Sequence, residues 1–138
     1  MSAVATATSL ALGLPSPARR RYAESETQRT VNQQLAWSLP DDAVHFAIPN
    51  GLMRSKKARA RAQGEGVMAG IPDLCVVHRG RAIFIELKSR RGVMSPAQRS
   101  MLRKLEYCGC PVLLCRSAPE VEAGLRGLGV PLKATVAA

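Results

Sequence analysis

Aromatic residues, acidic residues and long apolar runs are all scarce in this sequence. Aromatics make up 4% of the 138 residues, which disfavours a protein that binds single strands through base stacking. No apolar run approaches the roughly 18 residues that a membrane-spanning helix needs. Ten Asp and Glu residues stand against 20 Lys and Arg residues, a net charge of +10. This imbalance favours nucleic acid as the partner, with a merely soluble basic protein as the alternative.

The cysteines and the amino terminus also lack familiar patterns. The four cysteines and two histidines do not have zinc-ligand spacing, and four thiols without a disulfide framework indicate the cytoplasm. The start of the chain lacks the positive segment of a secretory signal. We therefore expect residues 1–21 to form a flexible tail, with a cleaved leader as the alternative, and residues 22–128 to form one domain followed by a tail over 129–138.

The segment from Gly70 to Gln98 carries the clearest chemical pattern. Glu86 and Lys88 end an apolar strand, and residues two apart on a strand point to the same face. Asp73 opens the preceding strand, and the short connection over 78–81 predicts an antiparallel hairpin. Asp73 should then lie next to Glu86, with Lys88 beside both.

Two converging carboxylates repel each other unless a cation lies between them. Hard cations such as Mg²⁺ and Mn²⁺ take oxygen ligands, usually one or two carboxylates with water and substrate phosphate. A neighbouring lysine can contact a phosphate oxygen or orient a nucleophilic water. The pattern therefore predicts metal-dependent hydrolysis of a phosphodiester bond.

The same residues resemble the PD-(D/E)XK nuclease superfamily, and their surroundings narrow the resemblance to its VRR-NUC family. Pro72-Asp73 followed by Glu86-Leu87-Lys88 is the superfamily signature. The narrower resemblance covers about residues 22 to 125, and the motifs that carry it are Ile48-Pro49-Asn50-Gly51, Gly70-Ile71-Pro72-Asp73-Leu74, Gly92, Ser95-Pro96-Ala97-Gln98 and Gly109.

The order of expected elements agrees with that resemblance. Apolar periodicity and turn residues predict helices over 22–38, 95–108 and 117–128, and strands over 43–48, 73–77, 83–88 and 111–115. The last strand should run parallel to the strand over 83–88 because a helix connects them. This is an α/β fold with a mixed central sheet flanked by helices, as in the αβββαβ core of PD-(D/E)XK restriction-endonuclease-like proteins.

The resemblance implies roles for individual residues. Asp73 and Glu86 would bind Mg²⁺ or Mn²⁺, with the Leu87 backbone carbonyl as a further ligand. Lys88 would orient the attacking water and support charge on the phosphate. The family carries a metal-side glutamate on its first helix, and Glu24 shares a stripe with Val31 and Leu35.

Two side-chain assignments have alternatives. Glu26 falls almost opposite Glu24 on the helix and is expected in solvent, whereas Glu24 could also serve only as a helix-terminal acid. Gln98 completes a capping box with Ser95, yet the family places a glutamine at this edge of the active site, where Gln98 would be a catalytic residue that helps to place water or Lys88. His45 is ambiguous too, and a core histidine is favoured over a catalytic one.

A basic segment over 51–66 precedes Asp73. Basic runs are usually solvated faces, but long segments in compact domains tend to be functional. We expect this segment to contact the phosphate backbone without reading sequence. The expected nucleic-acid contacts are Arg54, Lys56, Lys57, Arg59, Arg61, Arg90, Arg91 and Arg99.

Together these features predict a structure-selective DNA endonuclease in the cytoplasm. The size and layout are similar to those of Holliday-junction resolvases. Because a junction needs two paired cuts and each chain has one site, a homodimer is expected. The alternatives are a flap- or fork-type nuclease, a nonspecific nicking enzyme, an RNA-directed nuclease, or a non-catalytic DNA-binding module on a nuclease fold.

Overall fold

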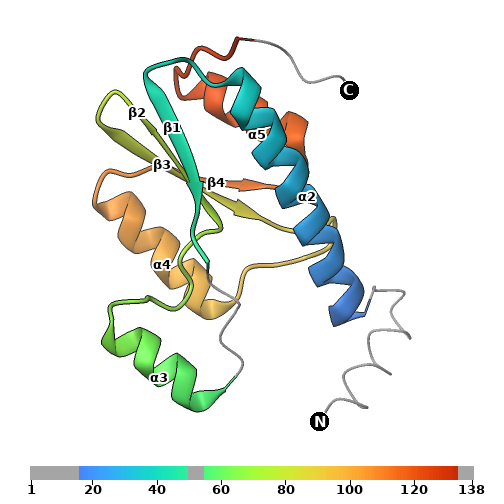
Figure 1. Cartoon of the computed structure of the whole chain (residues 1–138), viewed down its shortest axis with the longest axis vertical. Helices are drawn as coiled ribbons and strands as arrows, with labels where there is room; N and C mark the ends of the chain where they lie inside the picture. Colours follow the sequence, from blue (N-terminus) through green and yellow to red (C-terminus); the bar gives the residue numbers. More distant parts are fainter. Residues whose placement is uncertain (1–15, 50–54, 134–138) are drawn as a thin grey trace.

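One four-stranded mixed sheet forms the centre of the protein, and its strand order follows the chain (Figure 1). The structure is a computed structural model that describes residues 16–49 and 55–133. The first three strands pair antiparallel, and the fourth pairs parallel to the third, as the sequence predicts. In sheet order they are β1 (Ala43–Ala47), β2 (Leu74–His78), β3 (Arg81–Leu87) and β4 (Val112–Cys115).

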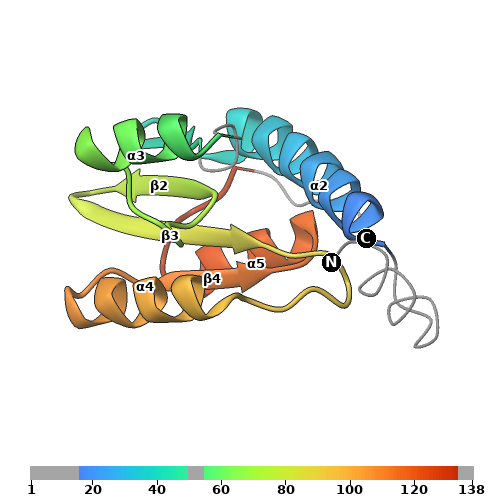
Figure 2. The ribbon, with the colours of Figure 1, turned by 90° about the horizontal axis from the view of Figure 1, so that it is seen from below.

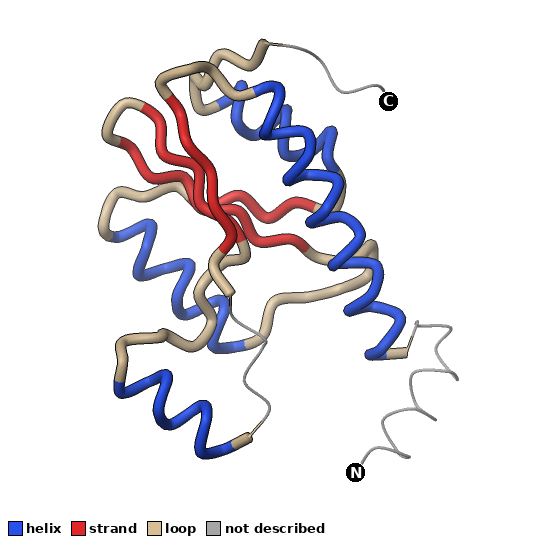
Figure 3. Tube along the Cα trace, in the orientation of Figure 1, coloured by secondary structure: helices blue, strands red, loops and turns tan. Residues whose placement is uncertain are grey.

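Helices cover both faces of this sheet (Figures 2 and 3). Each of the four begins after a serine whose hydroxyl accepts a hydrogen bond from a backbone N–H of the first turn. Within the described ranges none is long and apolar enough to cross a membrane. The helices are α2 (Pro17–Ser38), α3 (Lys56–Gly64), α4 (Pro96–Tyr107) and α5 (Ala118–Gly127).

The main core lies between the sheet and the pair α2 and α5. Ile83, Ile85 and Leu87 alternate along β3 toward this face, where they meet Val31 and Leu35 of α2. Burying each such side chain stabilises the fold by about 1.5–3 kcal/mol. The opposite face, which carries Glu86, is where α4 packs. The sheet thus separates a closed apolar core from a second face that α4 covers only in part, where Val44, Phe46 and Leu114 are exposed.

Three boundaries differ from the sequence prediction. Helix α2 begins at Pro17 rather than Tyr22, so residues 17–21 are helical instead of a flexible tail. Part of the basic segment forms α3. At the other end Val130 and Leu132 are buried in the core, and Lys133 N donates to the Ser38 carbonyl at 2.7 Å. The chain through Lys133 is therefore packed rather than loose.

Candidate active site

The β2–β3 register brings the two predicted carboxylates together. Leu74 pairs with Ile85 in the antiparallel ladder, so the next position opposes Asp73 and Glu86. The carbonyl of Asp73 accepts a hydrogen bond from Ile48 N at 2.8 Å, which continues the β1–β2 ladder to the same level. Asp73 thus lies at the end of the sheet, one residue before β2 begins. The predicted approach of Asp73 to Glu86 is confirmed.

A backbone group of Leu87 fixes the Asp73 side chain. Asp73 Oδ2 accepts a hydrogen bond from Leu87 N at 2.8 Å. The N–H and C=O of one strand residue point toward the same neighbouring strand, so the Leu87 carbonyl lies on the Asp73 side as well. Its apolar side chain points into the core and is 2% exposed. Leu87 therefore contributes to the core with its side chain and to the site with its backbone.

Glu86 is held by two side chains on its own face of the sheet. Lys88 Nζ lies 3.1 Å from Glu86 Oε1, and both side chains are buried. Gln98 Nε2 donates to the same Glu86 oxygen at 2.8 Å. Gln98 Oε1 meanwhile accepts from Ser95 N at 2.9 Å, completing the capping box of α4. Gln98 therefore caps α4 with one end of its amide and contacts Glu86 with the other, and its catalytic role stays a prediction.

Burial and mutual repulsion disfavour the ionised forms of the Asp73 and Glu86 carboxyl groups. Desolvation, followed by the charge of Asp73, raises the pKa of Glu86 to about 7, although Lys88 opposes the shift. The pKa of Asp73 is also raised, mainly by burial, and the Leu87 hydrogen bond counteracts this. Perturbed acids in one hollow are typical of functional sites. A cation bound between the two carboxylates would reduce the repulsion between them.

The first helix presents Glu24, not Glu26, to this end of the sheet. Glu24 Oε1 accepts a hydrogen bond from Ser89 N at 3.1 Å, directly after Lys88. Glu26 forms an exposed pair with Arg29 at 2.6 Å. The helical phase read from the sequence is therefore correct, and the metal-side role of Glu24 stays a prediction. A Cβ on Gly92 would lie only 3.2 Å from Glu24 Oε1, so a glycine keeps this corner open.

The donor set fits a hard divalent cation bound by two acids. Across residues 16–49 and 55–133, no group of three or more His, Cys, Asp or Glu side chains is arranged to hold a metal ion. Asp73 and Glu86 remain as a facing pair, each with one carboxylate oxygen committed to a protein donor. Mg²⁺ commonly uses one or two carboxylates with water and phosphate. The site fits that pattern, with the Leu87 carbonyl as a third oxygen.

A cavity of about 380 Å³ opens beside the carboxylates, between α3 and the start of α4. Asp73 and Gln98 form part of its wall, and Arg59 and Met68 face them from the α3 side. Gly70 makes this approach possible: a Cβ there would lie 2.4 Å from the Ala97 carbonyl oxygen, and its φ is +78°. The cavity leads from the basic helix to the site.

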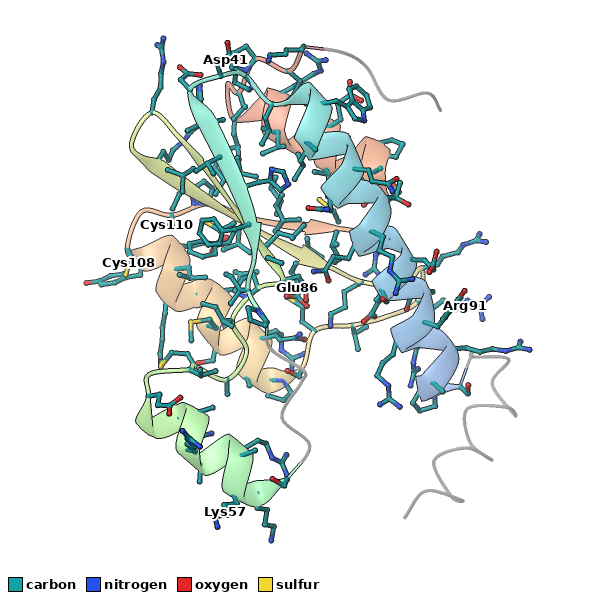
Figure 4. The ribbon with its side chains drawn as sticks, in the orientation of Figure 1. Asp41, Lys57, Glu86, Arg91, Cys108 and Cys110 are labelled. Carbon is teal, nitrogen blue, oxygen red and sulfur yellow. The ribbon has the colours of Figure 1, made fainter. Side chains whose placement is uncertain are left out.

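The predicted nucleic-acid contacts divide between the two sides of the site. Lys56, Lys57, Arg59 and Arg61 lie exposed on α3, where Arg61 also pairs with Glu65. Arg90 and Arg91 lie exposed after β3, and Figure 4 shows Lys57 on the α3 side of Glu86 and Arg91 on the α2 side. Arg99 lies on α4, and its Nη1 donates to the carbonyl of Met94, which precedes that helix, at 2.7 Å. Arg54 lies outside the described residues. His45 bonds Asn32 at 3.1 Å on the α2 face, away from the site.

Sequence reasoning missed two groups of residues near the site. Arg19, Arg20 and Tyr22 lie on the first turns of α2, beside Arg90 and Arg91. The signal for this extension was the pair Ser16-Pro17, a helix cap followed by a first-turn proline.

Arg116 is the second omission, and nothing local marks its role. Its Nη1 donates to the carbonyls of Ser89 at 2.5 Å, Gly92 at 2.7 Å and Arg90 at 3.3 Å. This one guanidinium therefore holds the loop between β3 and α4 in place.

Known proteins share this sequence pattern and fold. The model of the VRR-NUC domain family matches residues 16–119. One solved structure, described as a VRR_NUC domain protein, has a TM-score of 0.56 and 22% identity, covering 75% of this chain and 84% of its own. Another, described as a VRR_NUC domain, has a TM-score of 0.52 and 20% identity, with 75% and 95% covered. No curated protein matches the sequence significantly. The structural likeness supports a PD-(D/E)XK-like fold.

Proposed function

Because the chain belongs to the VRR-NUC domain family, we propose that it is a divalent-metal-dependent endonuclease that cuts branched DNA as a homodimer. Family membership makes it a nuclease domain; the metal, the branched substrate and the dimer are the proposed parts. One observation carries the proposal: Asp73 faces Glu86 at the end of the two central strands, where Lys88 and Gln98 both contact Glu86.

The proposed chemistry assigns the cation to Asp73, Glu86 and the Leu87 carbonyl. When bound, Mg²⁺ or Mn²⁺ polarises the scissile phosphate and lowers the pKa of water. Gln98 holds Glu86 in its orientation. Lys88 keeps a positive charge 3.1 Å from Glu86, where it can orient the attacking water and stabilise negative charge that develops on the phosphate. Glu24 orders the backbone just beyond Lys88 through Ser89 N.

The proposed substrate rests on two points. The protein is strongly basic, and its sequence predicts no element that would read DNA bases. Helix α3 carries exposed basic residues that suit phosphate backbone of any sequence. A protein that grips backbone discriminates DNA by shape, so branched DNA is the proposed target. A four-way junction needs two cuts, and a two-fold dimer would supply two sites.

The first experiment incubates the protein with labelled four-way junction, flap, duplex and single-stranded DNA. Each is tested with Mg²⁺, Mn²⁺ or EDTA, beside Lys88→Ala and the distant control Lys133→Ala. We expect paired cuts near the junction centre that need metal, are lost in Lys88→Ala and persist in Lys133→Ala. Sedimentation analysis should give a dimer.

The same experiment identifies the alternatives. Cleavage of flaps or plain duplex, with the junction spared, would keep the active site and reject the resolvase. Metal-independent binding without cleavage of any substrate would reject the enzyme and leave a DNA-binding module.

Metal binding also has a readout separate from activity. Because a ligand that binds only the folded state stabilises it, Mg²⁺ should raise the thermal midpoint of the wild type. The double variant Asp73→Asn/Glu86→Gln should show no such increase. An equal increase in both proteins would place the metal elsewhere.

A further inference from the structure

A second hollow lies on the side of the active site away from α3. It has a volume of about 580 Å³ and lies between the first turns of α2 and the segment that follows β3. Figure 4 shows Arg91 near this end of α2. Its walls are formed by Arg19, Arg20, Tyr22, Ala23, Ser89, Arg90 and Arg91.

The floor of this hollow is held by several contacts. Arg116 donates to the carbonyls of Ser89, Arg90 and Gly92. Glu24 Oε1 accepts from Ser89 N on the α2 side. The segment that carries Arg90 and Arg91 is therefore fixed to both α2 and the start of α5. A surface held in this way loses little conformational freedom when a ligand binds.

The charge of the hollow suits phosphate groups. Four of its seven wall residues are arginines, and none is acidic. The nearest acids of α2 are engaged, Glu24 with Ser89 N and Glu26 with Arg29.

Tyr22 makes the hollow more than a phosphate site. Its side chain is 68% exposed among the arginines, although the chain has only two tyrosines. An exposed aromatic ring offers a face on which an unpaired base can stack. Bases within a duplex are already stacked on each other and are not available to such a ring. Arginines that track the backbone, combined with a stacking platform, are typical of single-strand binding.

We propose that this hollow binds an unpaired strand of the DNA substrate, with Tyr22 stacked on a base and the arginines on flanking phosphates. The inference rests on the proposed function for the identity of the substrate. Ser89 directly follows Lys88, so the hollow borders the active site, and the proposed strand passes from one to the other. Helix α3 then contacts the DNA beyond the opposite side of the cut. Branched DNA that presents an unpaired strand next to the scissile phosphate would occupy the hollow and the active site together.

The test measures binding by fluorescence anisotropy in EDTA, which needs neither metal nor cleavage. A forked duplex with a single-stranded arm is compared with a blunt duplex of equal length. We expect Tyr22→Ala to lower affinity for the fork about 10-fold and to leave the blunt duplex unaffected. Tyr22→Trp, which keeps a stacking face, should retain fork affinity. The control Tyr107→Ala removes a ring that is 95% exposed on α4 and should change neither affinity.

The arginines are tested through salt dependence on the same fork. Each lost contact to a single-stranded phosphate lowers the slope of log affinity against log salt by about 0.7. Arg19→Gln/Arg90→Gln should therefore lower the slope by about 1.4. Arg79→Gln, at the far end of the sheet, should leave it unchanged.

Two results would overturn the inference. In one, Tyr22→Ala has no effect on fork binding; in the other, it weakens fork and blunt duplex equally. Neither result touches the nuclease proposal if the wild type still cleaves with metal. Conversely, fork binding that depends on Tyr22 in a protein that never cleaves would retain the hollow and reject only the enzyme.

Discussion

The two ends of the β2–β3 hairpin carry ionic clusters with opposite character. At the turn, Asp42 bonds Arg79 at 2.8 Å and His78 at 3.2 Å, with Arg79 largely exposed. The Arg79 hydrogen bond lowers the pKa of Asp42. At the open end, burial and a second carboxylate raise the pKa of Glu86 to about 7. The protein itself satisfies the first cluster, whereas the second is the one to which we propose that a metal ion binds.

Removing the charge of one carboxylate at the open end of the hairpin should have the largest effect on cleavage, and the same change at the turn should have almost none. Asp73→Asn keeps the size of the side chain and removes one proposed metal ligand. We expect cleavage to fall about 10³-fold, a loss typical of removing one preorganised electrostatic group. Asp42→Asn makes the same chemical change at the turn and should leave cleavage within about 2-fold, because surface pairs contribute little. Single-turnover cleavage rates measure both, and equal losses would contradict the contrast.

A glycine pair of equal φ tests how tightly the open end is packed. Gly70 and Gly80 both have a φ of +78°, but only Gly70 has backbone atoms within reach of an added Cβ. Gly80→Ala should cost about 1 kcal/mol from backbone strain alone. Gly70→Ala should cost about 2–4 kcal/mol because α4 must move.

Urea denaturation gives both free energies. Since Asp73 and Gln98 flank the same cavity, Gly70→Ala should also lower cleavage. Equal destabilisation by the two variants would show that the contact with Ala97 is not restrictive.

The pH dependence of stability should have opposite signs at the two ends. In metal-free protein the raised pKa of Glu86 means that the folded state binds a proton more tightly than the unfolded state. Its stabilising contribution is present below about pH 4.5 and is lost as pH rises through about 7. The loss is on the order of 3 kcal/mol. Asp42, with its lowered pKa, contributes stability that is lost as pH falls instead.

Glu86→Gln isolates this effect because glutamine resembles the protonated acid. In EDTA, the variant should match the wild type near pH 4 and be the more stable protein near pH 8. Thermal midpoints over that range measure the difference. Parallel curves for the two proteins would mean that Glu86 titrates normally.

Much of the open end could be predicted from the sequence because its determinants are local. Strand alternation placed Glu86 and Lys88 on one face, and a short turn set the register that brings Asp73 opposite Glu86. Helical phase distinguished Glu24 from Glu26 in the same way. Gln98 was predicted in two competing roles because an isolated motif does not show that an amide has two ends to use.

The rest depends on contacts between distant segments. The neighbours of Tyr22 are Arg90 and Arg91, and no periodicity links residues so far apart. In the sequence, Val130 and Leu132 resemble part of a short apolar tail. In the structure both are buried in the core, and Lys133 N donates a hydrogen bond to the Ser38 carbonyl. Arg116 is one basic residue among 20 in the sequence. Its importance lies in three carbonyls that the fold brings to it.

The hydrogen bond from Leu87 N to Asp73 has a consequence for how this site can change over generations. A backbone N–H is present in every amino acid except proline, so almost any codon at position 87 preserves the clamp on Asp73. The core restrains mutation there through its space and its apolar surroundings. Two descendants of this protein could differ at position 87 and still hold the carboxylate alike. Part of the site is therefore inherited as chain geometry, which a comparison of side chains does not detect.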